Sequence, residues 1–228
     1  FEGGSNSTFT RDYSGNNNSG RNNASAIFRA SFRPTEGVDG RGAYFFNTSN
    51  TSIQIANEAN FDFTTSFTLM AWINFTTTVN SNTIIAKGDG DVAYHYLFET
   101  VAGTGRLRAR ASGGTTVTGS VMSTGVWTHV AYTFNGSNLT LYINGLVDTS
   151  NGAATIGSAN NNPLRIGWEG FDGGTSQFFN GTIDEVYVFN RSLTAQQVNA
   201  LYQNRTDLIV ANELSAQQNW SACVTPND

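Results

Sequence analysis

The sequence predicts an all-β fold, and three observations support this prediction. Apolar and polar residues alternate along residues 125–149, GVWTHVAYTFNGSNLTLYINGLVDT, and a period of two is that of a strand with one buried face. The dipeptides Asn135-Gly136 and Asn144-Gly145 interrupt this pattern with residue types that two-residue hairpin turns require. The 228 residues are 39% hydrophobic but only 13% charged, with 24 glycines, so a core is available while helix-forming residues are scarce. We therefore expect a three-stranded meander at 125–149 and strands along most of the chain.

The same pattern predicts further strands on both sides of the meander. Their expected ranges are 26–32, 43–46, 52–55, 66–75, 83–86, 93–100, 106–111 and 115–120 before it, and 164–167 and 178–189 after it. Residues 66–75, SFTLMAWINF, carry large apolar side chains on both faces. Such a strand either lies inside a sandwich, or packs one face on the core and offers the other, with Trp72, as an aromatic shelf for a ligand.

One helix is predicted, at residues 195–202. Thr194 is the expected N-cap, and Gln197 follows three residues later, which is the pattern of a capping box. Leu193 and Val198 stand where the two apolar residues of a hydrophobic staple are expected.

Residues 204–228 return to strand character after this helix. We expect 1–203 to form the main domain and 204–228 to form a C-terminal β tail, which pairs with its own sheet, pairs with a neighbouring copy, or belongs to a further module. The single cysteine, Cys223, lies in this tail. It is either a half-buried apolar residue or one half of a bridge to another chain or segment.

The charge of the chain argues against two classes of partner. The net charge is −5, and Lys87 is the one lysine among the 12 basic residues. No basic stripe is present for nucleic acid or for an anionic membrane surface. No run of eighteen apolar residues occurs either, so we expect no membrane insertion.

Asparagine occurs in an unusual pattern. Acceptor triplets for N-linked glycans, Asn-X-Ser/Thr with X other than proline, begin at Asn6, Asn17, Asn23, Asn47, Asn50, Asn74, Asn135, Asn138, Asn180, Asn190, Asn204 and Asn219. Chance placement of the same residues predicts roughly six such triplets. The excess is typical of a secreted glycoprotein, while the alternative is that a surface rich in Ser, Thr and Asn produces triplets by accident.

Two loops carry candidate ligand-binding residues. Asp89 and Asp91 lie in the glycine-rich turn 87–91 and are either contacts for a ligand or cation, or part of a solvated turn. Trp168 and Phe171 lie beside carboxylates in the loop 168–174. Exposed aromatic rings of this kind stack on the C–H face of a sugar, and the alternative is plain packing.

Three arginines, Arg106, Arg108 and Arg110, alternate along one face of a predicted strand. A row of cations is typical of a solvent-facing edge strand, where it discourages strand addition. The alternative is an anion-binding site.

Catalysis is not expected. Glycoside hydrolases need two carboxylates about 5 to 9 Å apart across a cleft, but the one acidic pair in a good strand is Asp184-Glu185, whose adjacent side chains point to opposite faces. The histidines, His95 and His129, have no HExxH context, and no GxSxG motif occurs. Both histidines are interpreted as strand residues satisfied by their neighbours.

Two segments carry a family resemblance. WTHVAYTFNGSNLTLYINGLV (127–147) and FNGTIDEVYVFNRSLTAQQVNALY (179–202), together with FTLMAWINF, IIAKGDG and DYSGNNNSG, resemble the laminin-G-like, or concanavalin A-like, jelly-roll family of extracellular proteins. The resemblance spans nearly all of residues 1–203. The tail is similar to an edge of immunoglobulin-like surface modules.

The family resemblance implies a two-sheet antiparallel jelly-roll sandwich, often with a structural calcium ion at the sheet rim. By this resemblance Asp12, Asn17 and Asp184 would be calcium ligands. The early loop has asparagine where relatives often have another aspartate, which lowers its charge and hence its affinity for calcium.

Two hypotheses of function follow. The first is a non-catalytic, N-glycosylated adhesive module on the cell surface, which binds a glycan or a protein through the loops 87–91 and 168–174. The second is a glycosylated subunit of an extracellular filament or surface layer, in which the tail 204–228 pairs with a neighbouring copy as an added strand.

Overall fold

The computed structural model describes residues 5–6, 8–22, 30–47, 51–88, 94–170 and 177–205. Its elements, in chain order, are β1 (Phe9–Thr10), β2 (Gly20–Asn22), β3 (Ser31–Arg33), β4 (Ala43–Phe46), β5 (Ile53–Ile55), the 3-10 helix η1 (Glu58–Phe61), β6 (Phe67–Phe75), β7 (Asn82–Lys87), β8 (Tyr96–Thr100), β9 (Arg106–Ala111), β10 (Thr116–Val121), β11 (Thr128–Phe134), β12 (Leu139–Ile143), β13 (Leu146–Asn151), β14 (Leu164–Ile166), β15 (Gly181–Phe189) and α1 (Ala195–Tyr202). No helix among these residues combines the length and apolar character needed to cross a membrane.

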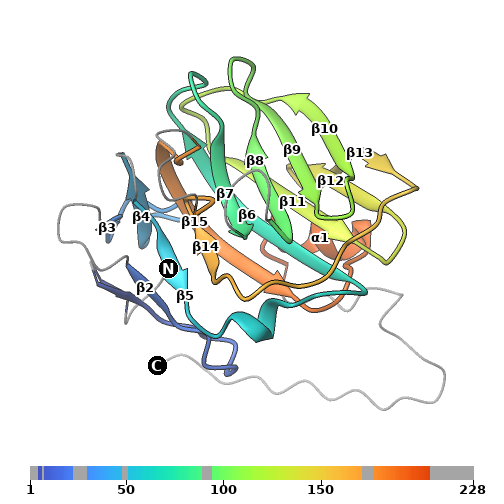
Figure 1. Ribbon diagram of the computed structural model, residues 1–228. Coiled ribbons are helices and arrows are strands. Elements are labelled where there is room, and N and C mark those ends of the chain that lie inside the picture. The colour runs from blue at the N-terminus through green and yellow to red at the C-terminus, as the bar shows by residue number, and fades with distance from the viewer. Residues whose placement is uncertain are drawn as a thin grey trace, which may run out of the picture.

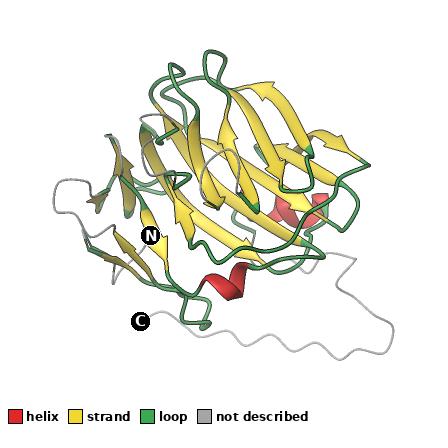
Figure 2. Ribbon diagram, in the orientation of Figure 1, coloured by secondary structure: helices red, strands yellow, loops and turns green. Residues whose placement is uncertain are grey.

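The strands form two antiparallel sheets, an arrangement visible in Figure 1 and, by secondary structure, in Figure 2. One sheet has the order β1-β2-β5-β14-β7-β8-β9-β10, and the other has the order β13-β12-β11-β6-β15-β4-β3. The chain passes repeatedly from one sheet to the other, so that β4, β6 and β15 lie in the second sheet while β5, β7 and β14 lie in the first. The predicted all-β jelly-roll sandwich is confirmed.

Most predicted ranges agree closely with the observed strands. The ranges for β4, β9 and α1 are the same in prediction and structure, and the ends of most others differ by one to three residues. The range 26–32 is the least accurate, because β3 begins only at Ser31, and residues 26–29 lie outside the described part of the chain. Of the predicted tail, the structure describes only Asn204 and Arg205.

The predicted meander is confirmed as β11, β12 and β13, with one correction. Asn144 and Gly145 form the expected two-residue turn, with φ of 49° and 75°, the left-handed values that its twist requires. The connection at Asn135-Gly136 is instead a loop of four residues, 135–138. The Asn135 side chain accounts for the longer loop, because its Oδ1 accepts hydrogen bonds from the backbone N–H of Ser137 and Asn138, at 3.2 and 2.8 Å.

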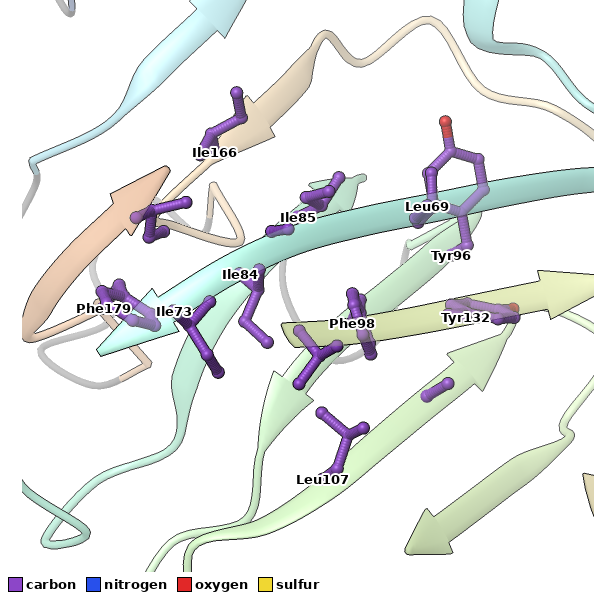
Figure 3. Close-up of a cluster of buried hydrophobic side chains, with 14 of the residues drawn as sticks. Leu69, Ile73, Ile84, Ile85, Tyr96, Phe98, Leu107, Tyr132, Ile166 and Phe179 are labelled. Carbon is purple, nitrogen blue, oxygen red and sulfur yellow. The ribbon is translucent and has the colours of Figure 1, made fainter. Parts of the chain in front are cut away.

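The core lies between the two sheets. Figure 3 shows Leu69 and Ile73 of β6 and Tyr132 of β11 facing Phe98 of β8 and Leu107 of β9, and all five are fully buried. Full burial of one such side chain stabilises the fold by about 1.5–3 kcal/mol. The period-two pattern of the sequence therefore becomes one continuous core.

Helix α1 explains why β6 is apolar on both faces. The Thr194 hydroxyl accepts a hydrogen bond from the Gln197 backbone N–H at 3.3 Å, and the Gln197 side chain accepts one from the Thr194 backbone at 2.9 Å, which confirms the capping box. Leu193 and Val198 pack on the outer face of the seven-stranded sheet. Trp72 stacks on Tyr202 at 5.6 Å between ring centroids. Packing against the helix therefore accounts for the position of Trp72, which stays partly exposed.

Lys87, the one lysine of the chain, is fully buried at the end of β7. Its ammonium group donates to Glu58 Oε2 at 3.0 Å and to the backbone carbonyls of Asn160 and Asn162 at 2.7 and 3.0 Å. Asp62 Oδ1 lies 2.8 Å away as a fourth, ionic neighbour. The three donors of the ammonium are thus all used, and they fasten two loops to the sheet.

We predict that Lys87→Met destabilises the fold by about 3 kcal/mol, because it leaves two carboxylates and two carbonyls without their shared cation. Urea denaturation of wild type and variant measures the difference. Arg11→Met, which removes an exposed cation, is the matched control and is expected to change stability by less than about 0.5 kcal/mol. In the wild type, an amine-acetylating reagent should modify Lys87 only after unfolding. Rapid acetylation of the folded protein at this position would contradict the buried ion cluster.

His129 is buried beside Trp72 and Tyr202, with ring centroids 5.4 and 5.6 Å away. Its Nδ1 has no hydrogen-bond partner among the described residues. Burial lowers the pKa of His129 from 6.5 to about 4. The folded protein therefore keeps this ring neutral in a pH range where the unfolded chain binds a proton.

The lower pKa of His129 in the folded protein than in the unfolded chain predicts that the fold loses stability in acid. His129 contributes stability above pH 6.5 that is lost as the pH falls towards 4, up to about 3 kcal/mol in total. The free energy of unfolding of His129→Phe should therefore fall less between pH 7 and pH 4 than that of the wild type. If this variant does not fold, NMR titration of the wild-type imidazole serves instead, and a midpoint near 6.5 would overturn the prediction.

Candidate functional site

The arginine row lies on β9, inside the eight-stranded sheet. Leu107 and Ala109 face the core, so Arg106, Arg108 and Arg110 share the outer face. The expected edge position is wrong, because β9 pairs with β8 on one side and with β10 on the other. The edge strand is β10, and the arginines are therefore placed above the sheet and not at its margin.

A buried carboxylate lies directly opposite the middle arginine. Glu99 pairs with Arg108 in the β8–β9 register and is fully buried. Both Nε and Nη2 of Arg108 lie 2.8 Å from Glu99 Oε1. Arg110 Nη1 lies 3.8 Å from the same oxygen, and its guanidinium stands 4.7 Å from the centre of the Tyr94 ring. Ion pairing and cation–π contact thus hold both guanidinium groups in place.

Arg108 and Arg110 line a hollow of about 480 Å³, which we call the arginine hollow. Its described lining is Asn80, Ser81, Ala102, Arg108, Arg110, Thr116 and Gln177. These residues come from the turn before β7, the turn after β8, strands β9 and β10, and the segment before β15. Guanidinium, amide and hydroxyl groups therefore converge on one space, whose chemistry is that of a site for a polar ligand.

Hydrogen bonds between loops fix the rim of the arginine hollow. The turn 101–105 is joined to the turn before β7 by the bond from Gly103 N to Thr78 O at 2.5 Å and by the bond from Ala102 N to Ser81 Oγ at 3.3 Å. The buried Asn82 side chain accepts a bond from Asn180 N at 2.9 Å. Three segments far apart in the sequence are thereby held together.

Trp168, predicted to be an exposed ring, is buried. Only 5% of its surface is exposed. It stacks on Phe178 at 5.5 Å between ring centroids, and the guanidinium of Arg165 lies 5.6 Å from its ring centre. The expectation of exposure is wrong because two neighbours cover the ring, and packing accounts for its position. The other candidates in these two loops, Asp89, Asp91 and Phe171, lie outside the described residues.

Two of the predicted calcium ligands share a second hollow of about 510 Å³. Asp12 and Asn17 line it, together with Arg11. Both oxygens of Asp12 already accept backbone N–H groups, Oδ1 from Ser14 and Oδ2 from Asn18, each at 2.8 Å. Partial burial raises the pKa of Asp12, but these hydrogen bonds outweigh it and lower the pKa overall. The carboxylate is therefore engaged within its own loop, and a guanidinium lies beside it.

The third predicted ligand, Asp184, lies on β15 in the other sheet. It is fully buried and accepts hydrogen bonds from Val38 N at 3.0 Å and Glu185 N at 2.8 Å. Burial raises the pKa of Asp184. The described residues contain no group of three or more acidic, histidine or cysteine side chains placed to hold a metal. Calcium binding at Asp12, Asn17 and Asp184 therefore stays a prediction.

The glycan acceptor residues differ in exposure. The side chains are exposed at Asn6, Asn17, Asn47, Asn135, Asn190 and Asn204, and partly buried at Asn74, Asn138 and Asn180. Asn23, Asn50 and Asn219 lie outside the described residues. The Oδ1 atom of Asn138 is buried.

Sequence reasoning found the arginines but missed the rest of the hollow. Glu99 could have been recognised, because the glycine-containing turn 101–105 joins the two strands as a hairpin and places residue 99 opposite residue 108. Asn80, Thr116 and Gln177 carry no such local signal. They meet the arginines only because of the order of strands in the folded sheet.

Several solved structures share this fold. The binding domain of Paraclostridial Mosquitocidal Protein 1 is 20% identical, with a TM-score of 0.65, over 85% of this chain and 49% of that one. Domain 4 of AbnA, an extracellular arabinanase from Geobacillus stearothermophilus crystallised with arabinotriose, is 20% identical with a TM-score of 0.59, over 76% and 81%. A structure of botulinum neurotoxin type C, whose cell entry depends on two ganglioside molecules, is 15% identical with a TM-score of 0.59, over 78% and 45%. The chain thus spans about half the length of the first of these.

Comparison with curated protein sequences finds no match. Comparison with family models does: the laminin-G-like model described as the concanavalin A-like lectin/glucanases superfamily matches residues 47–199. This range runs from the end of β4 into α1 and includes the strands that form the arginine hollow. Because the match covers well over half of the sequence, the chain belongs to the concanavalin A-like lectin/glucanases superfamily.

Proposed function

We propose that this chain is a non-catalytic, extracellular module that binds a glycan in the arginine hollow. The observation that carries the proposal is the convergence of hydrogen-bonding side chains on one space of about 480 Å³ above the outer face of the sheet. A sugar needs such groups for its hydroxyls. Strands β9 and β10 supply three of them, so the site stands on rigid elements.

The structural neighbours support a carbohydrate ligand. A domain with the same fold was crystallised with arabinotriose, and a neurotoxin with the same fold depends on gangliosides for cell entry. At 20% and 15% identity these likenesses concern the fold. They support a glycan as the class of ligand, while the residues that would contact it come from this chain alone.

The geometry of Glu99 supports binding without catalysis. A glycoside hydrolase uses one carboxyl group as a proton donor and a second about 5 to 9 Å away as nucleophile or base. Glu99 is fully buried and ion-paired with Arg108, so this carboxylate is already engaged within the protein. The described lining of the hollow supplies no second carboxylate.

The second hypothesis, a filament assembled by strand addition, depends on residues 206–228, which lie outside the described part of the chain. The described contacts favour the binding module. We further propose that the module is glycosylated, because six of the nine acceptor asparagines that the structure describes are exposed and glycans occupy surface positions of secreted proteins.

Glycan binding is tested with a steric variant. Thr116 is exposed on β10 and lines the hollow, so Thr116→Trp should fill the site and weaken binding about tenfold or more on an array of neutral and acidic oligosaccharides. Val121→Trp is the matched control, because Val121 lies on the same strand, is 64% exposed and is not part of the lining. Binding that survives Thr116→Trp, or no binding by the wild type to any glycan, would refute the proposal.

Glycosylation is tested by peptide mapping of protein from its native source. We expect glycans at exposed acceptors such as Asn6, Asn190 and Asn204, and lower occupancy at Asn138, which is partly buried. Enzymatic release converts each occupied asparagine to aspartate, which mass spectrometry detects. Bare asparagines at all six exposed positions would exclude the glycosylated form.

A further inference from the structure

We propose that the glycan bound in the arginine hollow is acidic, and that its carboxylate or sulfate group pairs with Arg108. This inference rests on the proposed function and narrows the class of ligand. It has three supports, which are the free donors of Arg108, the charge of the lining, and the kinds of hydrogen-bonding group that the lining offers.

Arg108 is held in position by Glu99, and part of its guanidinium does not contact that carboxylate. A guanidinium carries five N–H groups on three nitrogens. Two of these nitrogens, Nε and Nη2, contact Glu99. The side chain of Arg108 is 24% exposed and lines the hollow. Its Nη1 group therefore remains to bind a ligand. The ion pair also fixes the side chain before binding, so little conformational entropy is lost when an anion arrives.

The local charge of the site is opposite to that of the whole protein. Across the chain, 17 acidic residues outnumber 12 basic ones. The described lining carries two cations, Arg108 and Arg110, and no carboxylate. Glu99 lies beneath them, so these three side chains together bear a net charge of +1. A hollow of this kind concentrates anions from solution.

The lining is also rich in donors. Guanidinium groups donate hydrogen bonds but cannot accept them, and they occupy two of the seven described lining positions. A sugar hydroxyl can accept a hydrogen bond from a guanidinium, but it is neutral and also carries a donor. A carboxylate or sulfate presents acceptors only. Such a group matches the planar fork of Arg108 better than a hydroxyl does.

The experiment compares matched charged and neutral ligands. Binding is measured by calorimetry for oligogalacturonate against its carboxyl-reduced form, and for dextran sulfate against dextran. We expect the wild type to bind the charged member of at least one pair about tenfold more tightly, with binding that weakens as salt rises. The pair that shows this preference distinguishes a carboxylate ligand from a sulfate ligand.

Two variants, Arg108→Gln and Arg106→Gln, distinguish a specific contribution of the arginine hollow to affinity from the effect of overall surface charge. Both variants lose one positive charge from the same face of β9, but Arg106 is exposed and is not part of the lining. We expect Arg108→Gln to lose about tenfold in affinity for the charged ligand, and Arg106→Gln to stay within about twofold of the wild type. Arg108→Lys, which keeps the charge but not the planar fork, should be intermediate. Circular dichroism confirms that each variant is folded.

The outcomes separate the two proposals. Suppose that the wild type binds the charged and the neutral saccharide of each pair equally, and that Thr116→Trp weakens the binding of both. This result would overturn the proposal of an acidic ligand but would leave the proposal of a glycan-binding module. An equal loss in Arg106→Gln and Arg108→Gln would also overturn it, because the effect would then be one of overall charge. If no saccharide of any class binds, the proposed function itself fails.

Discussion

Each strand of a two-layer sandwich has one face in the core and another face that must be covered or made polar, and this constraint accounts for the organisation of the molecule. The seven-stranded sheet meets it by covering. Met70 and Trp72 on the outer face of β6 lie beneath α1, which is fastened by its capping box and by Leu193. In the eight-stranded sheet, the outward-facing residues Arg106, Arg108 and Arg110 of β9 meet it with polar groups.

Two fully buried charged residues, Lys87 and Glu99, are paired in different ways. Lys87 is surrounded by two carboxylates and two backbone carbonyls, so that every donor of its ammonium group is satisfied within the protein. Glu99 is satisfied instead by Arg108 and Arg110, which reach the surface of the hollow. The first arrangement is closed and stabilises loops. The second is open on one side, because an arginine fork can hold a buried anion with one edge and a ligand with another.

The sequence was sufficient to predict local secondary structure, but it was insufficient to predict which residues pack against each element. Period-two alternation predicted β4 and β9 correctly, and the capping box predicted α1, because these signals depend on residues within a few positions of each other. The errors share a different cause. Arg108 was placed at an edge, Trp168 was expected to be exposed, and Lys87 was placed in a turn. In each case the surroundings are set by how the chain folds: β9 lies between two other strands, other aromatic and cationic side chains pack on Trp168, and two loops enclose Lys87. Periodicity does not specify these contacts.

The difference between local and tertiary contacts also explains why only part of the arginine hollow could be predicted from the sequence. Its floor is a hairpin, in which Glu99 and Arg108 are brought together by the register of β8 and β9. Its rim comes from three other segments, and their meeting depends on backbone contacts such as Gly103 N with Thr78 O and on the buried Asn82 side chain. Side chains on paired strands keep a fixed spacing, whereas loops vary most freely in length and sequence. In the proposed binding module, the floor would therefore determine the preference for charge, and the rim would determine the shape of ligand that can enter.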